Sequence, residues 1–221
     1  MITHLYIIPI LAVTVFLLIR AEFADHRKYI YFLKPMATLF VLGTVTSAFF
    51  QPDYNGMYTR FVLIALLFSL GGDLALMFPK NRKAFSLGLG LFLTAHAVYT
   101  VAFMRVGQFS VWTLIPVAIM FILGISFYQL IHVKLGSMKG PVIAYIVIIS
   151  IMVVSATMVW ESSVMGKSQA LMIMGGASLF YISDIILAAN RFWKAWQYNR
   201  ISLAFYYSGQ LLIALAAGYS K

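Results

Sequence analysis

Apolar runs of about 20 residues, the length that an α-helix needs to cross the hydrocarbon core of a bilayer, recur from one end of this chain to the other. Hydrophobic residues make up 62% and charged residues 10% of the 221 positions, whereas soluble domains are about half apolar and a quarter charged. The runs do not alternate as membrane strands do. The sequence therefore predicts an all-α, polytopic membrane protein. Because no connector is long enough to fold alone, residues 1–221 are expected to form a single transmembrane domain.

The apolar runs predict eight transmembrane helices, separated by short polar or turn-forming segments. Arg20 follows the first run rather than preceding it, which favours a retained helix over a cleaved signal peptide. Pro79 and the basic residues after it mark the end of the third helix, and Pro141 is well placed to open the sixth. The expected helices cover residues 4–19, 29–50, 58–78, 85–104, 110–131, 141–160, 170–189 and 201–219.

The lysines and arginines are distributed unevenly between the two sides of the membrane. Of the sixteen, twelve lie in or beside the connectors after helices 1, 3, 5 and 7, and the remaining four are Arg60, Arg105, Lys167 and Lys221. By the positive-inside rule the first set is cytoplasmic, which places both termini outside, in the plasma or inner membrane if the source is bacterial. The net charge of +10 is thus interpreted as a topology signal and does not indicate a nucleic-acid partner.

Two of the six acidic residues lie well inside apolar runs, Asp73 in FSLGGDLALMF and Asp184 in LFYISDIILAANRF. A charged side chain at the centre of a membrane helix costs about 2.5–3.5 kcal/mol on insertion scales. Each aspartate is about five residues from the cytoplasmic end of its helix, roughly 7 Å deep at 1.5 Å per residue. We therefore predict a catalytic or binding pair. The alternative is a structural role, such as an ion pair with Lys34.

A carboxylate pair has a definite chemistry if its members approach closely. Two adjacent carboxylates cannot both stay ionised, so the pair would hold one proton near neutral pH. Asp73 and Asp184 would then supply one acid and one base at the same time.

Several other polar side chains are predicted to surround this pair in a pocket open to the cytoplasmic leaflet. His96 and Tyr99 reach toward the membrane midplane, and the others fall in the cytoplasmic halves of their helices. Lys34 could instead extend its side chain to the membrane surface. His96 could instead be a hydrogen-bonded residue of the protein core. The candidate substrate-binding residues are Lys34, His96, Tyr99, Tyr145, Asn190, Tyr206, Tyr207 and Gln210.

Other features of the chain favour packing roles or exclude known chemistries. Gly71-Gly72 is interpreted as a close helix contact. The chain has no cysteine and no HxxxH or HExxH spacing, so we expect no metal site.

FSLGGDLAL and LFYISDIIL align on their aspartates, and Pro35 and Pro141 open the preceding helices. These similarities are consistent with a 4+4 pseudo-repeat of parallel halves.

Five ordered motifs give the chain a resemblance to a known family. Lys34-Pro35 at the start of helix 2, FSLGGD, GLGLFLTAHAVY, YISDIILAANRF and YYSGQLLIA together resemble the YhhN family, whose characterised members are lysoplasmalogenases. The resemblance implies a hydrolase that cleaves the vinyl ether bond of lysoplasmalogens into a fatty aldehyde and glycerophosphoethanolamine or glycerophosphocholine. It implies Asp73 and Asp184 as catalytic residues, no cofactor, and a lysophospholipid, membrane lipid and water as partners. The oligomeric state stays open.

Two alternatives from other classes remain at this point. An intramembrane aspartyl protease also pairs a Gly-Asp motif with a second membrane aspartate, although the other motifs argue against it. A proton-coupled transporter also uses buried acids at a repeat interface, but its helices are expected to be broken near their middle.

Overall fold

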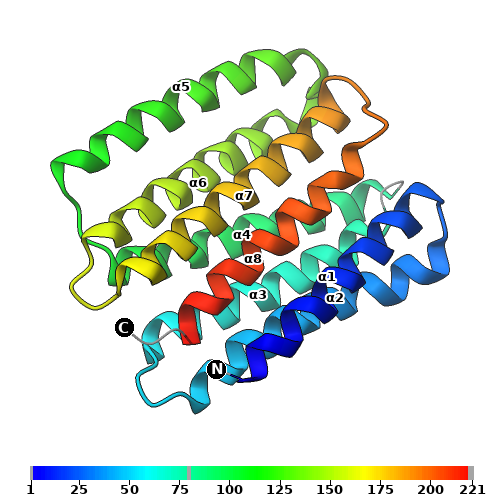
Figure 1. Ribbon diagram of the computed structural model, residues 1–221. Helices are drawn as coiled ribbons and strands as arrows, with labels where there is room; N and C mark the ends of the chain where they lie inside the picture. Colours follow the sequence, from blue (N-terminus) through cyan, green and yellow to red (C-terminus); the bar gives the residue numbers. More distant parts are fainter. Residues whose placement is uncertain (1, 79–80, 219–221) are drawn as a thin grey trace.

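The computed structural model describes residues 2–78 and 81–218, and within them the chain forms eight long α-helices (Figure 1). All eight are long and apolar enough to cross a membrane, which confirms the predicted polytopic all-α class. The helices are α1 (Ile2–Phe23), α2 (Arg27–Ser47), α3 (Gly56–Leu76), α4 (Arg82–Val106), α5 (Leu114–Ile131), α6 (Lys139–Met158), α7 (Lys167–Phe192) and α8 (Ser202–Gly218).

The helix boundaries differ from the predicted ones by a few residues because local hydrogen bonding, not hydropathy, ends a helix. The Asn55 side chain caps α3 by accepting from the Tyr58 N–H, and Asn81 caps α4 in the same way. α7 continues three residues beyond its predicted end, to Phe192. The predicted markers Pro79 and Lys80, and the predicted end of the last helix at residue 219, lie outside the described residues.

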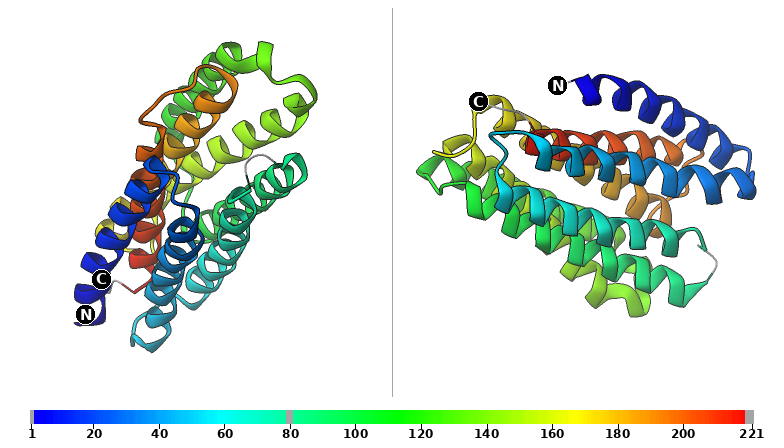
Figure 2. Two further views of the ribbon diagram at one scale, coloured as in Figure 1. Left: turned by 90° about the vertical axis from the view of Figure 1, so that its right-hand side faces the viewer. Right: turned by 90° about the horizontal axis from the view of Figure 1, so that it is seen from below.

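Six of the helices form a closed ring. α2 packs against α3, α3 against α4, α4 against α6, α6 against α7, α7 against α8, and α8 back against α2. α1 packs outside this ring on α2 and α8, and α5 packs mainly on α6, so that these two helices occupy different edges of the bundle (Figures 1 and 2). Each half of the chain thus contributes three ring helices, but α1 and α5 pack differently. The 4+4 repeat stays a prediction.

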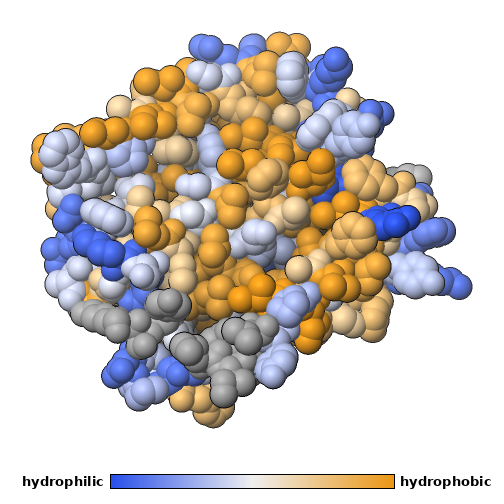
Figure 3. Space-filling view, viewed as in Figure 1, coloured by the Kyte–Doolittle hydropathy of each residue, from blue (hydrophilic) through white to orange (hydrophobic). Residues whose placement is uncertain are grey.

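The outer surface of the bundle matches a membrane environment. Hydrophobic side chains cover the middle of the helices, and hydrophilic ones gather toward their two ends (Figure 3). The eight spans make the chain a multi-pass integral membrane protein. Because successive helices alternate in direction, the connectors after α1, α3, α5 and α7 lie at one end of the bundle. We call this the basic end, since most lysines and arginines lie there.

Glycines allow the tightest contacts between ring helices. A Cβ atom on Gly72 would lie 2.6 Å from the Phe92 ring, which confirms the predicted helix contact at Gly71-Gly72. Between α7 and α8 the close contact is with backbone: a Cβ on Gly176 would lie 2.7 Å from the backbone oxygen of Gly209. A backbone atom cannot rotate away as a side chain can, so this contact admits only glycine.

Gly176→Ala should therefore destabilise the protein by about 1–3 kcal/mol, because the added methyl group must push α7 and α8 apart. The measurement is the thermal unfolding midpoint in detergent. Gly90→Ala on α4 is the matched control: nothing lies within 4 Å of its Cβ position, so the midpoint should stay the same or rise slightly. Equal midpoints for Gly176→Ala and the unmodified protein would contradict the backbone contact.

Candidate functional site

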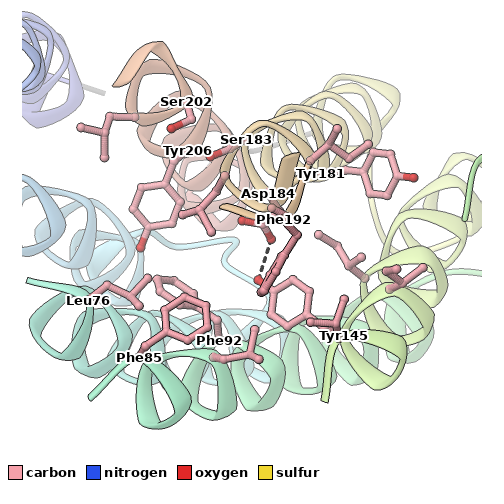
Figure 4. A pocket seen from close by; sticks show the side chains of 18 of the residues that line it. Leu76, Phe85, Phe92, Tyr145, Tyr181, Ser183, Asp184, Phe192, Ser202 and Tyr206 are labelled. Carbon is pink, nitrogen blue, oxygen red and sulfur yellow. Dashed lines mark hydrogen bonds between the residues drawn. The ribbon is translucent and has the colours of Figure 1, made fainter. Parts of the chain in front are cut away.

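A cavity of about 100 Å³ lies inside the ring of helices, toward the basic end. Side chains from all six ring helices line it, and most of its wall is apolar. A space of this size exceeds the roughly 10–15 Å³ that one water requires, so it has room for several waters or for the reacting part of a lipid. The ionisable side chains in its wall are Lys34, Asp73, Tyr145, Tyr181, Asp184 and Tyr206. Figure 4 labels the last four of these.

The carboxylate of Asp73 is almost fully buried and is surrounded by donors. Its Oδ2 accepts hydrogen bonds from the Thr38 hydroxyl at 2.7 Å and the Tyr206 hydroxyl at 2.8 Å. Its Oδ1 lies 3.5 Å from the Lys34 ammonium nitrogen, which is itself buried. The partners come from α2 and α8, so one side chain of α3 ties three ring helices together. These donors compensate the carboxylate for part of the hydration that it loses on burial.

Two further residues of α8 hold this arrangement in place. Gln210 Nε2 donates to the Tyr206 hydroxyl at 2.9 Å, and the Tyr207 hydroxyl donates to the backbone oxygen of Lys34 at 3.0 Å. Neither residue lines the cavity. They orient the groups that do.

Asp184 has a different set of partners and retains more exposure. Its Oδ2 accepts a 2.6 Å hydrogen bond from the Tyr145 hydroxyl of α6, drawn as a dashed line in Figure 4. The same oxygen lies 3.4 Å from Nε2 of His96, longer than a normal hydrogen bond. The Asp184 side chain is 16% exposed, against 2% for Asp73, so it faces the cavity more openly.

The protonation of His96 follows from its other ring nitrogen. Nδ1 lies 2.5 Å from the backbone oxygen of Phe92, which can only accept, so Nδ1 carries a proton. In the neutral ring Nε2 then has a lone pair directed at Asp184. A favourable contact needs one proton between the two groups, either on the aspartic acid or on the imidazole.

The two aspartates occupy separate sites in the wall of one cavity. Within residues 2–78 and 81–218 no hydrogen bond joins them, and each has its own partners. The rings of Phe92 and Phe180 pack edge to face with each other, with the Phe180 ring also against His96 and against Tyr206. This aromatic cluster joins residues from the two carboxylate sites.

The predicted site residues thus fall into three groups. Lys34, Asp73, Tyr145, Asp184 and Tyr206 line the cavity. His96, Tyr207 and Gln210 contact residues that line it. Tyr99 and Asn190 do not line the cavity.

Tyr99 and Asn190 have other surroundings. Tyr99 is fully buried and stacks on Phe103. Asn190 accepts a hydrogen bond from the Trp196 N–H, which shapes the connector between α7 and α8. Tyr99 thus contributes to helix packing, and Asn190 contributes to the shape of the loop.

Sequence reasoning missed Thr38, which makes the shortest hydrogen bond to Asp73. A usable signal existed, because Thr38 lies four residues after Lys34 and so shares its helix face. Ser183, a polar residue of the cavity wall, was visible beside Asp184 but was not counted as a site residue.

A second, larger hollow lies between α5 and α6. Its volume is about 690 Å³ and its lining, which also includes residues at the end of α4, is almost entirely apolar. Ile146 of α6 lines both this groove and the cavity, so the two spaces are neighbours.

A polytopic bundle with two separate carboxylate sites around one cavity is the class of protein that these observations define. The profile of the YhhN family matches residues 29–217, so the chain belongs to the YhhN family. The resemblance noted from the motifs is therefore confirmed.

Individual relatives differ in length and in name. Lysoplasmalogenase TMEM86B of Rattus norvegicus is 32% identical over 170 residues, which cover 74% of this chain and 64% of the relative. The Homo sapiens protein of the same name is 31% identical over 168 residues, which cover 74% of this chain and 66% of the relative. The membrane protein YhhN of Escherichia coli O157:H7 is 26% identical over 181 residues, which cover 81% of this chain and 83% of the relative. This chain thus spans a little under two thirds of the two mammalian relatives. No solved structure matches it.

Thr38→Val should destabilise the protein by about 1–3 kcal/mol, because it removes a donor from the buried Asp73 carboxylate while keeping the shape of the side chain. The thermal unfolding midpoint in detergent measures this change. Thr44→Val on the same helix is the matched control, since Thr44 is also fully buried and, among the described residues, its hydroxyl donates only to the Phe40 carbonyl of its own helix. If both variants shift the midpoint equally, the hydrogen bond to Asp73 contributes nothing specific.

Proposed function

We propose that this protein is a lysoplasmalogenase, a membrane hydrolase that cleaves the vinyl ether bond of a lysoplasmalogen. The products would be a fatty aldehyde and glycerophosphoethanolamine or glycerophosphocholine. The observation that carries the proposal is the pair of carboxylates with unlike partners on one cavity: Asp73 beside an ammonium, Asp184 beside an imidazole. The two mammalian relatives are named lysoplasmalogenase, which supports the same activity.

Vinyl ether hydrolysis requires a proton on carbon. Protonation of the β-carbon of the vinyl group gives an oxocarbenium ion, which water then captures to give a hemiacetal. The hemiacetal collapses to the aldehyde and the glycerol hydroxyl. We assign Asp184 as the acid, because the lone pair of His96 Nε2 favours a protonated neighbour and because Asp184 faces the cavity. The proton released by the attacking water restores it.

Asp73 has the complementary role in this mechanism. All its partners are donors, which is the environment of a carboxylate anion. A fixed negative charge in a water-poor cavity stabilises the developing oxocarbenium ion and orients the attacking water. Lys34 keeps the net charge of the buried pair at zero.

The cavity is too small for a whole lysolipid, so the hydrocarbon chain must lie elsewhere. The α5–α6 groove is apolar and adjoins the cavity at Ile146, which makes it the natural place for the alkenyl chain. The vinyl ether would then sit between the chain in this groove and a head group at the basic end.

The alternatives fit this geometry less well. Aspartyl proteases rely on two carboxylates that share a proton at contact distance, and here each aspartate has separate partners. Transporters of the broken-helix type have discontinuous helices beside the site, whereas α3 and α7 run unbroken through Asp73 and Asp184.

Turnover of a lysoplasmalogen in heavy water should release an aldehyde with one deuterium on the carbon beside the aldehyde group, because Asp184 exchanges its proton with solvent. Prompt reduction of the aldehyde and mass spectrometry measure the label. In ¹⁸O-labelled water the glycerophospho product should gain no oxygen, since water attacks the former vinyl carbon. An unlabelled aldehyde, or new oxygen in the glycerol product, would exclude this mechanism.

Active-site variants supply the controls for this assay. Asp73→Asn and Asp184→Asn should each abolish aldehyde release while the protein stays monodisperse, and the double variant should be little worse than either single one. Asp53→Asn, an exposed aspartate in the α2–α3 connector at the other end of the bundle, should keep full activity. Full activity in either cavity variant would return that aspartate to a structural role.

We also propose that the basic end is cytoplasmic, so that the cavity opens toward the cytoplasmic leaflet and both termini are outside. The chain has no cysteine, which makes single-cysteine labelling clean. In intact cells Asp53→Cys should react with an impermeant maleimide, and Ala195→Cys should react only after permeabilisation. The reverse pattern would invert the orientation.

A further inference from the structure

A third hollow, which we call the basic pocket, opens at the basic end between the start of α4, the α5–α6 connector and the end of α7. Its volume is about 380 Å³. Three cations from separate segments line it: Arg82 in the first turn of α4, Lys134 just after α5 and Arg191 in the last turn of α7. All three are exposed. The fold thus brings together charges that are far apart in the sequence.

The three cations have only neutral partners among the described residues. Arg82 donates to the Ser137 hydroxyl, Lys134 donates to the backbone oxygen of Trp193, and the Arg191 guanidinium stacks on the Phe85 ring at 3.6 Å. An arginine has five N–H donors and a lysine three, so each cation keeps donors free for another partner.

The acids of the protein lie elsewhere. Glu22 pairs with Arg200 and Asp25 with Arg27, Asp73 and Asp184 belong to the cavity, and the two remaining acids, Asp53 and Glu161, are in connectors at the opposite end of the bundle. The basic pocket therefore has three positive charges and no carboxylate to neutralise them. Its counter-charge has to come from outside the described chain.

The basic pocket adjoins the cavity that holds the aspartates. Phe85 and Phe192, labelled in Figure 4, line both spaces, with their ring centroids 6.5 Å apart. Arg191 follows Asp184 by seven residues, which places it on the same face of α7 and about 10 Å along the axis. The glycerol of a lysophospholipid separates its phosphate from its first ether linkage by five bonds, which is shorter than this rise. The long Arg191 side chain can make up the difference, because helical side chains lean toward the N-terminus of their helix and thus toward Asp184.

We propose that Arg82, Lys134 and Arg191 bind the phosphate of the lysophospholipid substrate, with the glycerol passing between Phe85 and Phe192 toward Asp184. This assignment rests on the proposed function for the identity of the substrate. Arginine and lysine are the usual phosphate ligands in proteins. Because the pocket has no carboxylate to receive an amine, it binds the phosphate and not the ethanolamine or choline attached to it.

Binding of a substrate analogue that cannot react tests the site without relying on catalysis. The probe is a saturated 1-O-alkyl lysophosphatidylcholine, which lacks the vinyl group, titrated calorimetrically in a nonionic detergent. Arg82→Gln, Lys134→Gln and Arg191→Gln should each weaken its binding about tenfold, since each removes a charge-assisted hydrogen bond. Arg191→Lys, which keeps the charge, should bind more tightly than Arg191→Gln.

Two controls separate the pocket from general surface charge. Lys83→Gln and Lys194→Gln remove exposed cations at the same end that do not line the pocket, and binding should stay within about twofold. A 1-O-alkylglycerol, which has no phosphate, should bind equally to all variants. The proposal is overturned if the pocket variants bind the lysophospholipid like the unmodified protein, if the controls weaken it equally, or if the alkylglycerol is affected to the same extent.

Inorganic phosphate distinguishes a head-group site from a site for a free anion. It should compete with the lysophospholipid, and its own binding should depend on the same three cations. Phosphate binding that depends on these cations, beside lysophospholipid binding that does not, would overturn the assignment to a lipid.

Hydrolysis, measured separately, distinguishes failure of this assignment from failure of the proposed function. With a lysoplasmalogen the pocket variants should raise KM and keep kcat. Vinyl ether hydrolysis with KM unchanged in these variants would overturn the phosphate site and leave the function intact. Cation-dependent binding of the analogue without any vinyl ether hydrolysis would support the phosphate site and overturn the function.

Discussion

The buried ion pair between Lys34 and Asp73 is the interaction on which the rest of the structure depends. Both side chains are almost fully buried, so each ion has lost most of its hydration and depends mainly on its partners in the protein. Removing either partner would leave an unpaired charge in an apolar interior, at a cost of about 3–5 kcal/mol. The positions of α2, α3 and α8 are therefore linked, because the ion pair and the Thr38 and Tyr206 hydroxyls are satisfied only when all three helices are in place.

The aromatic cluster around Phe92 and Phe180 gives the two carboxylates different environments. Phe180 packs against His96 on one side and Tyr206 on the other, so one ring contacts the supporting residues of both aspartates. Asp184 has an imidazole and a phenol as partners, and Asp73 has an ammonium and two hydroxyls. The proposed mechanism needs one carboxyl group that holds a proton and another that stays charged, and this separation of partners is consistent with it.

The proposed substrate has the same division of chemistry as the three hollows. The α5–α6 groove is apolar, the cavity contains the acids, and the basic pocket contains cations. Shared residues join them: Ile146 lies between the first two, and Phe85 and Phe192 between the last two. A lysolipid has its chain, its ether and its phosphate in this order. The correspondence is a reason to consider the hollows as parts of one binding surface.

Helices and individual acids were predictable from the sequence because both are local properties. A run of apolar residues forms a membrane helix whatever its neighbours are, and an aspartate within such a run is costly wherever the helix packs. The helix ends were less predictable, since they depend on caps such as Asn55 and Asn81. Of the predicted site residues, Lys34, Tyr145 and Tyr206 line the cavity with the two aspartates, whereas Thr38, which donates to Asp73, was not predicted and Asn190 shapes a connector.

The sequence by itself determined the class of protein, the helices and the two aspartates that lie within membrane spans. Only the tertiary structure decided that these aspartates are separate and which partners each one has. It also decided that Arg82, Lys134 and Arg191, which are separated by tens of residues, line one pocket. The physical reason is that the hydropathy of a helix and the cost of burying a charge in it depend on the residues of that helix alone. Protonation and ligand binding depend on distances between helices. Those distances are set by packing contacts such as Gly176 on Gly209, which no single helix encodes.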